Sequence, residues 1–326
     1  MKKIIFFGTS DFGIESMNEI NKKYNLISVV TNPDKKIGRG MKITKTKIKI
    51  IAEKHNIKVF QPSDLNNTDF INSLKKLNPD LFVVIAFKKL PEEIWKIPLY
   101  GTFNLHASLL PKYRGAAPIN WAIINGEKET GLTTFFINNK IDAGDIIMKK
   151  KCKIELNDSF ENVYNKMIKI SPDIISETIG KIFKGNLKTI NQFYENNEFK
   201  APKFFKNDLI IDWNKKCKEI YDFIRAFSPR PGSRTTLLVK KKNNLIFEQP
   251  LIITKVSNFC FTNNKKIDEK YKLYFDHEKN NIFIQNNSGK FIVEKIKLPN
   301  KNEIDSISFF NGFLNKKENI GDYYFN

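Results

Sequence analysis

Cysteine, histidine and glycine are scarce in this chain, with 3, 3 and 15 copies among 326 residues. The cysteines, Cys152, Cys217 and Cys260, lie far apart and form no CxxC pair. This spacing argues against a disulfide framework and a zinc cluster, and it suits a reducing cytosol. No set of His, Cys and carboxylate residues has the spacing of metal ligands, so we expect no metal.

Long apolar runs are also missing. No stretch approaches the roughly 18 residues that suggest a membrane-spanning helix. The opening residues have a basic flank but only four apolar residues before Gly8, which is too short for a secretory signal. We therefore expect a cytoplasmic protein with no membrane partner. Its length and its hydrophobic content of 41% are sufficient for two domains.

Positive charge is in excess, with 55 Lys/Arg against 35 Asp/Glu and a net charge of +20. Basic surfaces attract polyanions because binding releases the counterions condensed on phosphates. A compositional bias toward Lys, Asn, Ile and Phe would produce the same excess, and both interpretations stay open. The placement of the charge is therefore more informative than its size.

Strand and helix signals alternate over residues 1–187. Apolar strands are expected at residues 3–7, 26–30, 59–60, 81–87, 102–106 and 131–137. Helices are expected at residues 12–23, 48–55, 69–77, 117–124 and 159–183. The last of these should be interrupted or kinked at Ser171-Pro172. The continuous apolar run at 81–87 is typical of a strand buried on both faces of a parallel sheet. This part is predicted to be a Rossmann-like α/β domain.

The pattern changes after residue 187. Residues 188–205 lose periodicity and are interpreted as an interdomain linker. Beyond a helix at 215–227, short strands are expected at residues 235–239, 245–247, 251–256, 271–275, 282–285 and 291–296. Evenly spaced short strands predict a small barrel, so residues 206–326 should form an OB-like β-barrel domain. This part has 22 Lys/Arg against 14 Asp/Glu, a net charge of +8.

Residues 104–118 carry the most informative motif. Asn104 and His106 lie two apart on an expected strand, so both side chains leave the same face and can converge on one small group. The carboxyl end of a strand is also where doubly wound sheets bind ligands. Asp142 follows a later strand and can bring a carboxylate to His106, which favours the imidazolium. An amide and an imidazolium can stabilise the oxyanion that forms when an amine attacks a carbonyl carbon.

Four short motifs together resemble the folate-dependent formyltransferase family: Asn104-x-His106, Ser108-Leu109-Leu110-Pro111, Tyr113-Arg114-Gly115 and Asp142-x-Gly144-Asp145. The resemblance implies catalysis by Asn104, His106 and Asp142, with 10-formyltetrahydrofolate as the formyl donor. It also implies folate contacts for the residues of the second motif, Ser108, Leu109, Leu110 and Pro111.

Finer features resemble the branch of this family that formylates methionyl initiator tRNA. These are the turn at residues 8–13, the basic loop at 31–40, and the segments at 201–203, 211–213 and 224–229. The resemblance implies that the basic loop and the barrel contact tRNA, and that the protein is a monomer. The implied tRNA contacts are Lys35, Lys36, Arg39, Lys42 and Lys203, with Arg39 as the leading candidate.

Three other functions are considered. A formyltransferase for a small amine, an amino-sugar nucleotide or glycinamide ribonucleotide, would share the three catalytic residues but would need neither the basic loop nor a basic barrel. A formyl-folate hydrolase is disfavoured because its relatives carry a regulatory domain before the catalytic one, whereas this chain begins at the first strand. An RNA-binding module without activity is disfavoured because Asn104, His106 and Asp142 are all retained.

Overall fold

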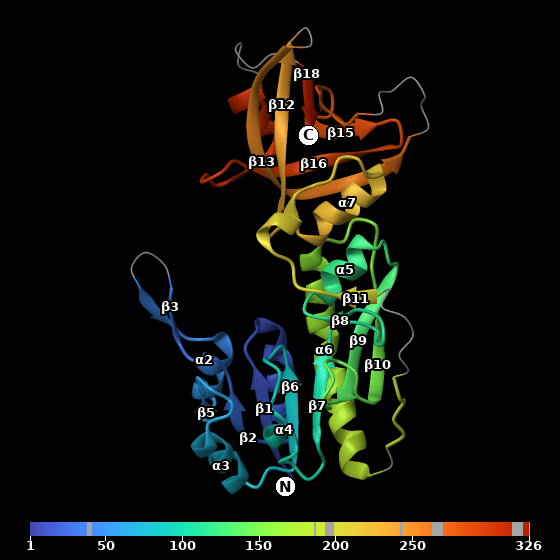
Figure 1. Ribbon diagram of the computed structural model, residues 1–326. Coiled ribbons are helices and arrows are strands. Elements are labelled where there is room, and N and C mark those ends of the chain that lie inside the picture. Colours follow the sequence, from blue (N-terminus) through green and yellow to red (C-terminus); the bar gives the residue numbers. More distant parts are fainter. Residues whose placement is uncertain are drawn as a thin grey trace. The chain divides into compact units, whose positions relative to one another are not determined.

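The computed structural model describes residues 1–37, 41–185, 187–192, 199–241, 244–262, 270–314 and 322–325. The chain forms two compact units, and each is built from more than one stretch of sequence (Figure 1). The first unit comprises Met1–Pro118, Thr130–Cys152 and Tyr164–Ala201. The second comprises Ile119–Glu129, Lys153–Val163 and Pro202–Asn326.

A seven-stranded sheet in the order β10-β9-β7-β6-β1-β2-β5 forms the centre of the first unit. Its strands are β1 (Lys3–Gly8), β2 (Asn25–Val30), β5 (Lys58–Phe60), β6 (Leu81–Ile85), β7 (Thr102–His106), β9 (Glu129–Phe136) and β10 (Ile146–Lys153). The strands from β7 to β5 are parallel, and β9 is antiparallel to β7. All five residues of β6 are buried, as the apolar run indicated. The predicted Rossmann-like fold is confirmed.

The helices and short turns of this unit follow the predicted alternation. They are η1 (Asp11–Gly13), α1 (Ile14–Lys23), α2 (Lys47–Lys54), α3 (Thr68–Lys76), α4 (Glu92–Trp95) and α6 (Phe160–Lys184). Helix α5 (Pro118–Ile124) belongs mainly to the second unit. Helix α3 begins where the Asn67 side chain accepts the Phe70 backbone N–H at 2.9 Å, which satisfies one of the free donors of the first turn. It buries Phe70, Ile71 and Leu74, a helical spacing that places them on one face.

The sequence predicted an interruption or a kink at Ser171-Pro172. The interruption is absent, because α6 runs continuously from Phe160 to Lys184 with Pro172 inside it. Proline removes the N–H that would bind the carbonyl of Ile168, four residues earlier. The Ser171 hydroxyl donates to that carbonyl instead, at 2.9 Å. The neighbouring serine therefore satisfies the acceptor that proline leaves open.

A two-stranded hairpin, β3 (Lys35–Ile37) and β4 (Lys42–Thr44), follows β2 in the first unit. Asp34, at its base, accepts a hydrogen bond from Lys49 at 2.7 Å and one from Gln61 at 2.7 Å. The hydrogen bond from Lys49, and to a smaller extent the one from Gln61, lowers the pKa of the Asp34 carboxyl. The hairpin is thus attached to α2 through an ionised aspartate.

The second unit contains a closed antiparallel barrel. Six strands form the ring in the order β13-β12-β18-β14-β15-β16, and β13 also pairs with β16 to close it. The strands are β12 (Ser233–Lys241), β13 (Asn244–Phe261), β14 (Lys272–Asp276), β15 (Asn281–Asn286), β16 (Gly289–Lys297) and β18 (Asp322–Phe325), and β17 (Glu303–Asp305) pairs with β16. The predicted barrel domain is confirmed.

Strand β13 replaces the two short strands expected at 245–247 and 251–256. Pro250 lies inside it and pairs with Thr236 of β12, before the pairing with β16 begins at Ile252. One side of β13 is therefore without a ladder partner at Pro250, which is where a strand tolerates a missing N–H.

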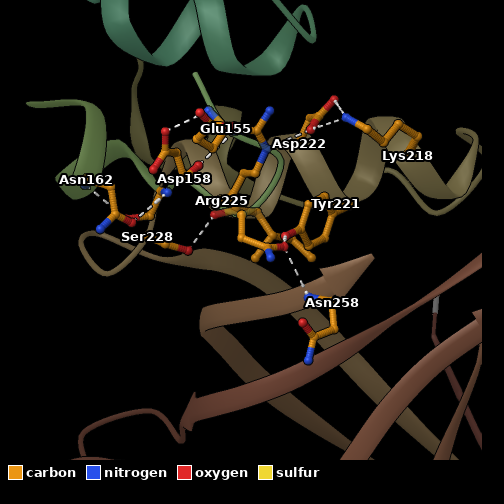
Figure 2. A network of polar contacts seen from close by, with 12 residues as sticks. Glu155, Asp158, Asn162, Lys218, Tyr221, Asp222, Arg225, Ser228 and Asn258 are labelled. Carbon is orange, nitrogen blue, oxygen red and sulfur yellow. Dashed lines mark hydrogen bonds and ion pairs between the residues drawn. The ribbon is translucent and has the colours of Figure 1, made fainter. Parts of the chain in front are cut away.

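Helix α7 (Cys217–Ala226) packs on the barrel core and is tied to the segment Lys153–Val163 by polar contacts (Figure 2). Arg225 donates from Nε to Asp222 Oδ1 at 2.7 Å and from Nη1 to the Asp158 carbonyl at 2.8 Å. The Tyr221 hydroxyl donates to Asn157 Oδ1 at 2.8 Å. Part of the second unit is therefore encoded between β10 and α6, far from the barrel in sequence.

Candidate active site

His106 is the last residue of β7, at the carboxyl end of a strand that lies parallel to β6. Asn104 pairs with Phe135 and His106 with Thr133 of β9, so the two side chains share one face of the sheet. His106 is buried, with 6% of its surface exposed, and Asn104 is half-buried. The predicted juxtaposition of an amide and an imidazole is therefore present at the edge where such sheets bind ligands.

The two ring nitrogens of His106 face different acceptors. Nε2 lies 2.8 Å from the Tyr113 carbonyl oxygen, which can only accept, so Nε2 carries a hydrogen. Nδ1 lies 3.8 Å from Asp142 Oδ2. That separation is too long for a direct hydrogen bond.

Asp142 is held in position by the backbone around it. Its Oδ2 accepts the Gly115 N–H at 3.0 Å. Asp142 itself has φ +50°, a left-handed conformation that tight turns use. At Gly144, an added Cβ would lie 1.6 Å from the Phe136 carbonyl oxygen, so only glycine allows this close approach. The loop after β9 thus turns back toward His106.

The predicted folate-contacting segment forms a tight turn after β7. The Ser108 hydroxyl donates to the Lys112 carbonyl at 2.7 Å, and Thr133 Oγ1 accepts the Leu110 N–H at 3.1 Å. Ser108 and Leu110 are fully buried, and Leu110 packs with Phe135 and Ile146. Leu109 is half-buried and Pro111 is exposed. The buried side chains hold the turn, whereas Leu109 and Pro111 retain surface that a ligand can contact.

Two further residues support the Asp142 loop, and the sequence patterns did not assign them this role. Gln192 Nε2 donates to the carbonyls of Asp142 at 3.2 Å and Gly144 at 2.7 Å. Its Oε1 accepts hydrogen bonds from Nε and Nη2 of Arg114 at 3.1 and 2.7 Å. Gln192 lies in the polar stretch predicted as a linker, where no periodicity marks it.

A hollow of about 510 Å³ lies beside this loop. It is lined by Asn138, Asn139, Lys140, Ala143, Asp145, Asn191 and Gln192. In the stretches of chain that the structure describes, no group of His, Cys, Asp or Glu is placed to hold a metal ion. No helix in those stretches is long and apolar enough to cross a membrane.

The residues predicted to bind tRNA are distributed over both units. Lys35 and Lys36 are exposed on β3, and the backbone of Lys42 begins β4. Arg39 lies outside the described residues. Lys203 belongs to the second unit and is exposed, with its Nζ 5.7 Å from the centre of the Phe205 ring.

Two family models match the chain. Residues 2–179 match the model described as formyl transferase, and residues 203–314 match the one described as formyl transferase, C-terminal domain. The chain belongs to the formyl transferase family. The family predicted from the Asn104, His106 and Asp142 motifs is thereby confirmed.

Several relatives within the formyl transferase family match nearly the whole chain. The methionyl-tRNA formyltransferase of Bacteroides thetaiotaomicron is 36% identical over 325 residues, which cover 95% of each chain. That of Parabacteroides distasonis is 37% identical over 317 residues, again 95% of each chain. That of Azobacteroides pseudotrichonymphae is 46% identical over 245 residues, 73% of this chain and 76% of the relative.

Solved structures share the formyl transferase fold. The sugar 3N-formyl transferase WlaRD, in the presence of dTDP and 5-N-formyl-THF, matches with a TM-score of 0.60 and 24% identity, covering 93% of this chain and 99% of that one. An N-formyltransferase from Helicobacter canadensis, with folinic acid and dTDP-3-aminofucose, matches with a TM-score of 0.61 and 22% identity, covering 90% and 99%. At these identities the likeness concerns the fold alone.

Proposed function

We propose that this chain transfers the formyl group of 10-formyltetrahydrofolate to the amino group of methionyl initiator tRNA. The observation that carries the proposal is the similarity to methionyl-tRNA formyltransferases over 95% of both chains. The juxtaposition of Asn104, His106 and Asp142 in one site supports the chemistry.

The proposed reaction is a direct transfer without a covalent enzyme intermediate. The amino nitrogen of methionine attacks the formyl carbon, and negative charge develops on the formyl oxygen. The amide of Asn104 and the Nδ1–H of a protonated His106 donate hydrogen bonds to that oxygen, since Nε2–H of His106 is already bound to the Tyr113 carbonyl. The bond from the formyl carbon to N10 of the folate then breaks. The amine loses a proton, relayed through water near Asp142, and N10 gains one.

The donor is proposed to be a folate because two structures of the same fold are named with folate derivatives, 5-N-formyl-THF and folinic acid. The residues proposed to contact it are Ser108, Leu109, Leu110 and Pro111. Since the side chains of Ser108 and Leu110 are buried in the turn, their contacts with folate would be made by the backbone.

A small amine, such as a sugar amine, is the second candidate for the acceptor. It is favoured by the fold likeness to sugar formyltransferases, which extends over 99% of their chains. The barrel therefore does not separate the two acceptors, because these proteins also match along nearly their whole length. Two observations favour tRNA over a small amine. Relatives with higher sequence identity and similar length are named methionyl-tRNA formyltransferases, and the exposed side chains of Lys35 and Lys36 can contact a phosphate backbone.

Transfer from 10-formyltetrahydrofolate would be measured with charged methionyl initiator tRNA, a sugar-nucleotide amine and glycinamide ribonucleotide side by side. Formylation of the tRNA alone supports the proposal. Transfer only to a small amine would overturn the acceptor, and transfer to none would overturn the enzymatic activity.

The role of His106 is tested in the same assay by His106→Ala. We expect kcat to fall by about 10²–10³-fold, the usual cost of removing one hydrogen-bond donor to an oxyanion, with tRNA affinity nearly unchanged. His55→Ala is the matched control, since His55 is exposed at the end of α2. Equal activity of the two variants would remove His106 from the mechanism.

A further inference from the structure

Gln192 is buried beside the catalytic loop, and its carboxamide uses all of its hydrogen-bonding groups. Only 6% of its surface is exposed. Its oxygen accepts two hydrogen bonds from the planar fork of Arg114, at 3.1 and 2.7 Å. Its nitrogen donates to the carbonyls of Asp142 and Gly144, at 3.2 and 2.7 Å. The amide orientation is fixed by these partners, because a guanidinium only donates and a carbonyl only accepts.

The segment that carries Gln192 is attached to the same sheet. Ile190 and Ile146 exchange two backbone hydrogen bonds, each of 2.8 Å, where β10 begins. Arg114 lies in β8 (Arg114–Gly115), and the next residue, Gly115, donates its N–H to Asp142 Oδ2. The Asp142 residue is therefore bound at its carboxylate by Gly115 and at its carbonyl by Gln192.

We infer that Gln192, supported by Arg114, is a positioning residue that holds the Asp142 carboxylate in place beside His106. This inference rests on the proposed formyl transfer. The gap of 3.8 Å between Asp142 Oδ2 and His106 Nδ1 leaves the pair without a direct hydrogen bond, so the position of Asp142 depends on the backbone that carries it. Asp142 also has a left-handed φ of +50°, which the surrounding contacts must maintain.

Gln192→Glu is the decisive variant because it has almost the same shape. The new carboxylate still accepts from Arg114 but cannot donate to the carbonyls of Asp142 and Gly144. We expect kcat to fall on the order of 10- to 100-fold, the effect of a small displacement of a catalytic group, with KM for both substrates nearly unchanged. Wild-type kcat in Gln192→Glu would overturn the inference, since it would mean that only the contact with Arg114 matters.

A double-mutant comparison separates positioning from general stability. If Gln192 acts through Asp142, Gln192→Glu should cost less than about 2-fold in kcat in an Asp142→Asn background, because effects of groups that act as a unit are not additive. A full 10- to 100-fold loss in that background would assign Gln192 a separate role and refute the inference. Thr189→Val is the control, because Thr189 is exposed on the same segment and is not among the residues that line the hollow beside the catalytic loop.

A measurement without substrates distinguishes failure of this inference from failure of the proposed function. Amide hydrogen exchange at residues 138–145 should be faster in Gln192→Glu than in wild type or Thr189→Val, because two anchoring hydrogen bonds are lost. Unchanged exchange would refute the positioning role whatever the enzyme formylates. Faster exchange in a protein that formylates no acceptor would retain the anchoring contact and reject the reaction.

Discussion

The buried ion pair of α7 leads to a graded prediction about the stability of the second unit. The side chains of Arg225 and Asp222 are 3% and 4% exposed and lie 2.7 Å apart (Figure 2). Lys218 also contacts Asp222 and is 28% exposed. Asp222 therefore has a second cation nearby, whereas the guanidinium of Arg225 has Asp222 as its carboxylate partner and the Asp158 carbonyl as an additional acceptor.

Removing the carboxylate should cost more than removing either cation. Asp222→Ala leaves a buried guanidinium without its counter-charge, which we expect to lower the free energy of unfolding by about 3–5 kcal/mol. Arg225→Met leaves Asp222 paired with Lys218, so the loss should be about 1–3 kcal/mol. Lys218→Met removes a partly exposed partner and should cost about 0–1 kcal/mol. The double variant Asp222→Ala/Arg225→Met should be more stable than Asp222→Ala alone, because no buried charge is left unpaired.

Urea unfolding monitored by tryptophan fluorescence would measure these differences. Of the three tryptophans, Trp121 and Trp213 belong to the second unit, so a Trp95→Phe background reports on that unit alone. The urea concentrations at the unfolding midpoint are compared among variants whose free energy of unfolding has the same dependence on urea concentration. The reasoning fails if Asp222→Ala costs no more than Lys218→Met, or if the double variant loses the sum of both single losses.

Three further predictions concern the site, the barrel core and tRNA. Gly115→Ala should lower activity at least 10-fold and stability by about 1–3 kcal/mol, because Gly115 has φ +128° and an added Cβ would lie 2.4 Å from the Ala201 carbonyl oxygen; kinetics and a urea melt check this. Burial raises the pKa of the Cys217 thiol to about 12 from an ordinary 9.0. The folded state therefore favours the neutral thiol. The resulting contribution to the free energy of unfolding is complete below pH 9 and decreases toward pH 12, by up to about 1.4 kcal/mol per pH unit. Urea melts from pH 8 to 11 should therefore fall more steeply for wild type than for Cys217→Ala, and parallel curves would contradict the assignment. Arg39→Ala should raise KM for tRNA several-fold while folate affinity measured by titration stays constant; the reverse pattern would remove Arg39 from the tRNA contacts.

Local sequence patterns predicted much of the first unit because its elements follow short-range rules. Every residue of the apolar run that forms β6 is buried. The predicted alternation of strands and helices also agrees with the sheet in which β6 lies between β7 and β1. Strand β10 was missed, since lysines occupy four of its eight positions, on both faces, and only Ile146, Ile147 and Cys152 are buried. At α6 the proline suggested a break or a kink, but the helix is continuous, and the Ser171 hydroxyl satisfies the carbonyl that the proline leaves open.

For the candidate site, too, the sequence predicted some features and the tertiary structure decided others. The sequence by itself determined that Asn104 and His106 share one face of the sheet, because they are two residues apart on a strand. Their motif also identified the family. The sequence also predicted Asp142 beside His106, and only the tertiary structure decided which groups hold Asp142 there. Asp142, Arg114 and Gln192 come from separate segments, and their contacts depend on how those segments pack rather than on any local period. Such hydrogen bonds leave no pattern in the sequence, because a buried carboxamide and an exposed one are both simply glutamine in a polar stretch.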